Sequence, residues 1–287
     1  MAVANSQIRV IASNLCPLAT LTSAPVEHDV ATMPVANLQN SNRTLSWRST
    51  AIGVGDIARI DVEMPERKYI SALVLDGHNL RAGDLWRLRL FSGPAKTGTL
   101  TETEWTEALV PKTAGELDWG IDTLVATVFD NWDRAYSVIW FGLLGVQSME
   151  IEIVSEGNEA GYVEANRMLF GQAVSPSRNF TYGYDLDYLD TSSMELTEGG
   201  SPKVEPGVLR RLIRVTLPRI NDATERSTWA DFLRTSGGKA EIFISLFPEQ
   251  GGKRERDYSM VCIVQSRSPL TNRSATAHTL NLTFQET

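Results

Sequence analysis

Residues that could carry chemistry are few and widely spaced in this 287-residue chain. Nucleophilic catalysis requires a serine or cysteine close to a histidine, but none of the three histidines accompanies a Gly-x-Ser-x-Gly turn. His78 lies in the turn Asp76-Gly77-His78-Asn79, where we expect it to hydrogen-bond to backbone groups. The sequence therefore predicts no catalytic triad.

Two pairs of carboxylates are close enough in sequence to be weighed as the acid and base of a glycoside hydrolase. They are Glu150 with Glu152, and Glu156 with Glu159. The first pair falls on the polar side of an alternating strand pattern, where charged side chains are expected to face water. We therefore expect no catalytic residue, and we expect that the protein is not an enzyme.

Metal and cofactor sites are not predicted either. The acidic cluster of Asp185, Asp187 and Asp190 lacks the glycine and the closing glutamate of a calcium loop. The segment Gly53-x-Gly55 leads into a strand pattern, and no Lys-Ser/Thr pair follows it as in a phosphate-binding loop. We therefore expect neither a metal ion nor a cofactor.

A long connection with few strand signals carries three widely spaced tryptophans, Trp105, Trp119 and Trp132. Exposed aromatic rings can stack on sugars or anchor a protein interface. The apolar run 138–141 that follows is expected to belong partly to the core. For the other rings, contact with a subunit and contact with a ligand are equally open interpretations.

Charge and composition exclude two classes of partner. The net charge is −8, and residues 1–172 hold all of the excess, with 13 basic and 21 acidic groups. Such a surface repels phosphate backbones, so we expect no direct binding of nucleic acid. We also expect no membrane insertion, because no apolar run reaches the roughly 18 residues that a spanning helix needs.

The two cysteines, Cys16 and Cys262, are far apart and show no metal-ligand or disulfide spacing. The N-terminal sequence shows no secretion-signal pattern. Both features favour synthesis in a reducing compartment.

Alternation with a period of two predicts antiparallel strands over 59–64, 86–90 and 149–153, each with one buried and one solvated face. The run 70–75 is almost continuously apolar and precedes Asp76-Gly77. This pattern predicts a central strand that is covered on both faces.

One helix is predicted, over residues 222–236. Asp222 is placed to cap its first amides, and Glu225 stands three residues further on, as in a capping box. The pair Gly237-Gly238 supplies a stop. A second, one-turn helix is expected over 34–38, where Pro34 suits a first helical position.

A domain boundary is predicted near residue 173, where a strand pattern ends at Gly171 and Ser175-Pro176 follows. We therefore expect a β domain over 1–172 and a second domain over 173–287. The second domain is predicted to be a β-sheet with one flanking helix. Its strand patterns lie near 212–217, 240–246, 258–265 and 279–284. The predicted fold class is mainly β.

Several phrases of the first part together resemble a discoidin-type, galactose-binding-like jelly roll over roughly residues 8–172. They are Ile11-Ala-Ser-Asn14, Met33-Pro-Val-Ala-Asn-Leu38, Leu45-Ser-Trp-Arg-Ser49, Ile70-Ser-Ala-Leu-Val-Leu-Asp-Gly-His-Asn-Leu80, Glu150-Ile-Glu-Ile153 and Gly161-Tyr-Val-Glu-Ala-Asn-Arg-Met-Leu-Phe-Gly171. The resemblance implies an N-terminal β-sandwich. It also implies that any sugar would bind at loops near Trp47, His78 and the 105–132 segment, so the candidate contact aromatics are Trp47, Trp105, Trp119 and Trp132.

A jelly roll followed by a β domain with one helix resembles minor tail or baseplate proteins at the tail tip of long-tailed bacteriophages. That resemblance implies a structural subunit that is made in the bacterial host cytoplasm and incorporated into the virion tail tip. It would assemble as a homo-oligomeric ring around the tail tube, with a hub-like or tube-like second domain. Its partners would be tube, hub and tape-measure proteins.

The main alternative is a carbohydrate-binding module that contacts glycans of the host surface. A third reading, an enzyme that degrades host polysaccharide, is the least favoured, because no acid/base pair is evident.

Overall fold

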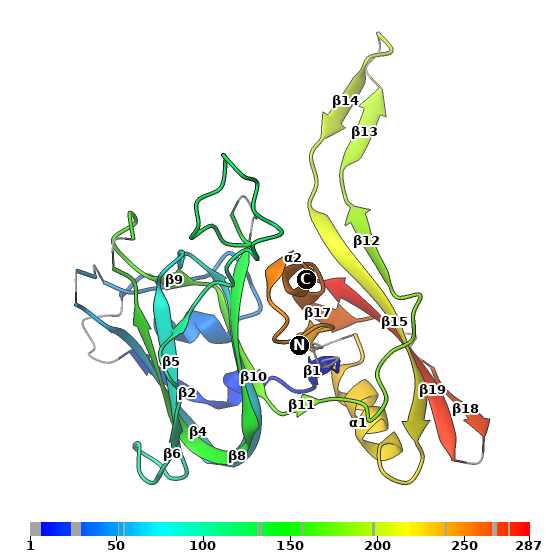
Figure 1. Ribbon diagram of the computed structural model, residues 1–287, viewed down its shortest axis with the longest axis horizontal. Coiled ribbons are helices and arrows are strands. Elements are labelled where there is room, and N and C mark those ends of the chain that lie inside the picture. The colour runs from blue at the N-terminus through cyan, green and yellow to red at the C-terminus, as the bar shows by residue number, and fades with distance from the viewer. Residues whose placement is uncertain are drawn as a thin grey trace.

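The computed structural model describes residues 7–23, 30–50, 52–53, 55–130, 132, 134–156, 158–196, 199–238, 240–265, 269–274 and 276–287. The chain is mainly β, as the sequence predicts, and its strands form two large antiparallel sheets that lie side by side (Figure 1). Among the described residues, no helix is both long enough and apolar enough to cross a bilayer.

The first sheet has the order β10-β4-β8-β5-β6, with β2 beside β4 and β7 beside β5. A small pair, β3 and β9, and two 3-10 helices, η1 and η3, accompany it. The helical turn expected over 34–38 is η3. The bounds are β2 (Thr20–Ser23), β3 (Trp47–Arg48), β4 (Ala58–His78), β5 (Leu85–Phe91), β6 (Thr99–Glu102), β7 (Thr106–Glu107), β8 (Ala135–Val154), β9 (Glu164–Ala165), β10 (Arg167–Gly171), η1 (Cys16–Leu18) and η3 (Val35–Gln39).

The first sheet folds over on itself because its two longest strands, β4 and β8, bend together (Figure 1). Their register shifts between Glu63 and Lys68, where Pro65 cannot donate to the ladder. Apolar side chains from both sides of the bend, such as Ile60 and Leu73, therefore meet in one core. The result is a β-sandwich of the kind expected for a jelly roll.

Strand β4 is buried on both faces over 70–75, which confirms the prediction of a central, covered strand. Leu73 and Leu75 point into the sandwich core. Ala72 and Val74 point the other way, into a cluster that includes Phe243 of the second sheet. One strand thus serves two hydrophobic cores.

The outer face of the first sheet carries alternating charges that neutralise one another across the strands. Glu152 stands in register between Arg59 of β4 and Arg87 of β5. Its carboxylate accepts hydrogen bonds from both arginines, at 2.9 Å from Arg59 Nε. Glu150 is held in the same way by Arg89, at 2.9 Å. The prediction that the two glutamates face water is wrong, because they are buried beneath these long side chains.

The second sheet has the order β11-β1-β16-β17-β19-β15-β12, with β18 beside β19. Helices α1 and α2 belong to this unit, and a separate hairpin of β13 and β14 extends from it. The bounds are β1 (Arg9–Ile11), β11 (Ala173–Val174), β12 (Asp185–Asp190), β13 (Ser193–Leu196), β14 (Pro202–Glu205), β15 (Leu209–Asn221), α1 (Arg226–Ser236), β16 (Ile242–Ser245), α2 (Gly252–Asp257), β17 (Ser259–Val264), β18 (Leu270–Ser274) and β19 (Ala277–Glu286).

Helix α1 ends where the sequence predicts but begins at Arg226 instead of residue 222. Asp222 does not cap it, because its carboxylate pairs with His278 and Arg226. The chain first makes a turn, in which the Asn221 side chain accepts a hydrogen bond from the Ala223 amide at 2.9 Å. Trp229 and Phe232, both on the inner face of α1, are buried in the core of the second sheet.

The two units share strands and contacts. β1 falls within the range predicted for the first domain, yet it pairs with β16 of the second sheet. Helix α2, which was not predicted from the sequence, packs on the first unit. The Glu116 carboxylate accepts the Lys253 amide at 2.7 Å, and the Tyr136 hydroxyl donates to the Glu255 carbonyl at 3.2 Å. The units are therefore held together by both backbone pairing and side-chain contacts.

We expect the substitution Glu152→Ala to lower the free energy of unfolding by about 3 kcal/mol, because it leaves two arginines facing a buried site without its carboxylate. Urea denaturation checks this. Glu66→Ala is the control, since Glu66 pairs with Lys68 on an exposed surface and its loss should leave stability unchanged. An equal effect of the two substitutions would contradict the structural role of the ion pairs that Glu152 makes with Arg59 and Arg87.

Candidate functional site

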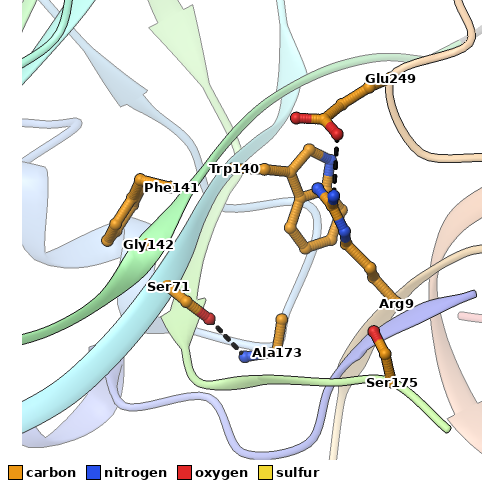
Figure 2. Close-up of a pocket in the computed structure, with 8 residues that line it drawn as sticks. All are labelled: Arg9, Ser71, Trp140, Phe141, Gly142, Ala173, Ser175 and Glu249. Atoms are coloured by element: carbon orange, nitrogen blue, oxygen red, sulfur yellow. Dashed lines mark hydrogen bonds and ion pairs between the residues drawn. The ribbon is translucent and has the colours of Figure 1, made fainter. Parts of the chain in front are cut away.

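A crevice of about 460 Å³ lies where the two units meet (Figure 2). The Arg9 guanidinium lies 5.1 Å from the centre of the Trp140 ring and pairs with the Glu249 carboxylate at 2.8 Å. Ser71 lies at the opposite end of the crevice, and its hydroxyl accepts the Ala173 amide at 2.8 Å. The crevice thus presents an aromatic ring beside an ion pair.

The eight residues that line the crevice include neither a histidine nor a cysteine that could activate a nucleophile. The Trp140 Nε1 atom is buried without a hydrogen-bond acceptor among the described residues. An acceptor on a bound molecule could satisfy it.

Glu150, one of the carboxylates weighed for glycoside hydrolysis, does not have the environment of a general acid. Burial opposes ionisation of Glu150, but hydrogen bonds from Lys96 and Arg89 outweigh it and lower the pKa of Glu150. A general acid needs a raised pKa. Within the described residues, no group of three or more His, Cys, Asp or Glu side chains could hold a metal ion.

His78 occupies a buried position at the end of β4. Its Nδ1 accepts the Leu80 amide at 3.3 Å, as expected for a histidine that bonds nearby backbone, and its Nε2 lies 2.7 Å from the Ser137 hydroxyl. Burial lowers the pKa of His78 to about 3. His78 is therefore neutral at ordinary pH.

Two of the four candidate aromatics contribute to the sandwich itself. Trp47 is fully buried in the first core, because β3 pairs with β9 and turns the ring inward. It is thus a core residue and cannot contact a partner or a sugar. Trp105 is half-buried, and the Arg87 guanidinium covers its ring at 4.5 Å.

The other two candidate aromatics, Trp132 and Trp119, lie in different surroundings. Trp132 sits at the junction of the units, where the guanidinium of Arg256 lies 4.0 Å from its ring and that of Arg211 lies 5.5 Å away. Trp119 is 79% exposed, in the loop between β7 and β8. Ile121 and Leu124 of the same loop are also exposed, so the loop presents an apolar surface.

One exposed feature of the second unit was not predicted from the sequence. Strands β12 and β15 continue beyond the second sheet into the β13–β14 hairpin, and together they form an arm that projects from the body (Figure 1). We call residues 185–196 and 199–214 the arm. A signal was present in the sequence, because Met194 and Leu196 alternate with polar residues just before Gly199-Gly200.

No protein-family model matches the chain, and no curated protein matches it. Among solved structures, it is similar to the family 32 carbohydrate-binding module of C. perfringens NanJ in complex with galactose. The identity is 9%, over 57% of this chain and 98% of that chain, with a TM-score of 0.35. The chitosan-binding module 1 of a Paenibacillus sp. IK-5 chitosanase/glucanase is 17% identical, over 55% and 98%, with a TM-score of 0.36. The family 32 module of AlyQ in complex with 4,5-unsaturated mannuronic acid is 12% identical, over 53% and 92%, with a TM-score of 0.33.

We expect His78 to make the protein less stable in mild acid. Its pKa is about 3 when folded and about 6.5 when unfolded, so only the unfolded chain takes up this proton between those values. The free energy of unfolding should therefore fall by up to about 1.4 kcal/mol per pH unit as pH drops through this window. His78→Asn should remove that part of the slope in urea titrations at several pH values. Identical slopes in the two proteins would contradict it.

Proposed function

We propose that this protein is a structural subunit that assembles with other copies of itself through the arm. The observation that carries the proposal is the apolar face of the β13–β14 hairpin. Nothing in the same chain covers this face within the described residues, since Met194 and Leu196 are 70% and 72% exposed. Soluble monomers rarely expose contiguous apolar surface of this kind without a partner for it.

Strand pairing sorts the side chains of the hairpin onto two faces. Met194 stands opposite Val204, and Leu196 stands opposite Pro202, so one face is entirely apolar. The other face carries charged residues, including Glu195 opposite Lys203. The hairpin is therefore amphipathic, although it has no core of its own.

The limited stability of an isolated hairpin supports the same proposal. A two-stranded hairpin is only marginally stable alone in water, so burial of its apolar face by another chain would stabilise it. The arm is also well anchored, because β15 pairs with both β12 and β19. A Cβ atom at Gly207 would lie 2.3 Å from the backbone of Thr191 and Ser192, so this close approach requires glycine.

The specific setting that we propose is the tail tip of a long-tailed bacteriophage. It follows from the resemblance of the sequence to tail-tip proteins, and the arm suits it, because arm-to-body contacts between copies generate rings when their rotation closes. In this setting the subunit would be non-enzymatic and would contact tube, hub and tape-measure proteins as well as its own copies.

We expect the purified protein to form oligomers that dissociate on dilution, as measured by mass photometry. The triple substitution Met194→Ser, Leu196→Ser and Val204→Ser should leave monomers, because it removes the apolar face. Glu195→Ser with Lys203→Ser is the matched control on the opposite face, and it should assemble as the original protein does. Circular dichroism spectra of both variants should match that of the original protein, since the hairpin contributes no residue to the three hydrophobic clusters of the body.

Two results would contradict the arm as the assembly device. One is a monomer at every concentration of the original protein. The other is unaltered assembly of the triple variant.

Carbohydrate binding is the second candidate function, and the exposed ring of Trp119 favours it. An exposed tryptophan can stack on the apolar face of a sugar. Sugar binding is also what the jelly-roll resemblance implies for loops of the sandwich, and the solved structures named above are sugar-binding modules.

If this second candidate holds, a glycan array should yield at least one ligand, and Trp119→Ala should weaken its binding about tenfold. Ile121→Ala is the matched control, because it removes an exposed apolar side chain of the same loop that cannot stack on a sugar. Equal loss in both variants, or an empty array, would contradict glycan binding through Trp119.

A further inference from the structure

A second cavity, of about 340 Å³, lies between the two units and shares no lining residue with the Trp140 crevice. Its lining includes Asn14 of the segment that follows β1, Arg167 of the sandwich and Glu241 of the second unit. We call this space the junction pocket. Its volume falls within the range of small-molecule sites.

The alternation of side chains along two strands directs Arg167 and Glu241 toward each other. Met168 and Phe170 of β10 point into the sandwich core, so Arg167 points to the opposite side, toward the second unit. Glu241 directly precedes β16 and lies on the same side as Phe243, which packs against the sandwich. The two side chains meet there, with Arg167 Nη2 at 2.7 Å from Glu241 Oε2.

Four buried polar atoms at this pocket make no hydrogen bond to any described residue. They are Nε and Nη1 of Arg167, Nδ2 of Asn14 and Oε2 of Glu241. The Glu241 oxygen lies within ion-pair distance of Arg167, but the guanidinium does not direct an N–H group at it, so the contact balances charge without a hydrogen bond. Buried polar atoms are normally paired, so these four atoms indicate that a partner is missing.

The side chains that carry these atoms are held in place before any ligand arrives. Asn14 Oδ1 accepts the amide of Cys16 at 3.0 Å and the amide of Phe170 at 3.3 Å, which fixes the orientation of its Nδ2 group. Arg167 is 7% exposed in its side chain, and β10 pairs with β4 along its whole length. A pre-organised site of this kind loses little conformational entropy on binding.

The chemistry of the unpaired atoms specifies the ligand. Arg167 and Glu241 carry opposite charges, so their pair leaves no excess charge for an ion to balance. Three of the four unpaired atoms, on Arg167 and Asn14, are donors, and the fourth, on Glu241, is an acceptor. A hydroxyl group has one donor and two acceptor lone pairs, so adjacent hydroxyl groups match this excess of donors and also supply a hydrogen to the carboxylate.

We propose that the junction pocket binds a small neutral ligand with adjacent hydroxyl groups, either a polyol or a monosaccharide. Arg167 and Asn14 donate hydrogen bonds to its hydroxyl oxygens, and one of its hydroxyl groups donates to Glu241. The ligand thereby bridges the two units. Trp119 does not line this pocket, and the site does not depend on the proposed assembly.

The test is saturation-transfer NMR of the full chain with three hydroxylated probes, glycerol, myo-inositol and glucose. A fourth probe, 1,4-dioxane, is neutral and accepts hydrogen bonds but cannot donate one. At least one hydroxylated probe should bind, and dioxane should not. Titration of the signal gives the Kd.

Two variants remove the recognising groups. Asn14→Asp exchanges only the donor Nδ2 for an oxygen and should raise the Kd about fivefold or more. The double substitution Arg167→Gln with Glu241→Gln removes the charged donor without leaving a buried charge unpaired, and it should raise the Kd at least about tenfold.

Two controls leave the junction pocket intact and should leave the Kd unchanged. Glu66→Gln with Lys68→Gln replaces an exposed ion pair in β4, as a match for the double substitution in the pocket. Trp119→Ala removes the exposed ring that was considered for glycan binding. Circular dichroism shows which variants fold, and the folded pocket variants decide the matter.

Several results would overturn the proposal. Failure of all three hydroxylated probes to bind would show that water alone satisfies the groups of the pocket. Equal binding of dioxane would show that hydroxyl groups are not recognised. An unaltered Kd in the folded pocket variants, or loss of binding in Trp119→Ala, would place the ligand elsewhere.

Discussion

Burial of both faces of strand β4 is the constraint on which the rest of the structure depends. One set of its side chains closes the sandwich, and the alternate set, with Ala72 and Val74, packs against the second sheet through Phe243. Burial of apolar surface is the largest favourable term in folding, so two cores that share a strand stabilise each other. The crevice at Trp140 exists because this shared strand brings the two units into contact.

Several elements could be predicted because their signals are local. The apolar run 70–75 predicted a strand that is covered on both faces. The pair Gly237-Gly238 predicted the end of α1. The fold class followed from strands that alternate with a period of two. In each case the pattern lies within one short segment, and its neighbours in sequence are also its neighbours in space.

The predictions that were wrong concern residues whose structural partners lie far away in the sequence. Glu150 and Glu152 are buried because arginines on two other strands lie in register with them, and no local pattern reports that register. Trp47 is buried because its two-residue strand pairs with Ala165. The arm was not predicted because its amphipathic pattern is short.

The pairing of β1 with β16 has a consequence for how the chain is made. β1 leaves the ribosome well before its partner at Ile242–Ser245. Contacts this distant in sequence form slowly, because a long loop must close first. The sandwich can therefore fold during translation while β1 is not yet paired with β16. Completion of the second sheet then becomes a late step, in which β16 pairs with the β1 strand made long before it.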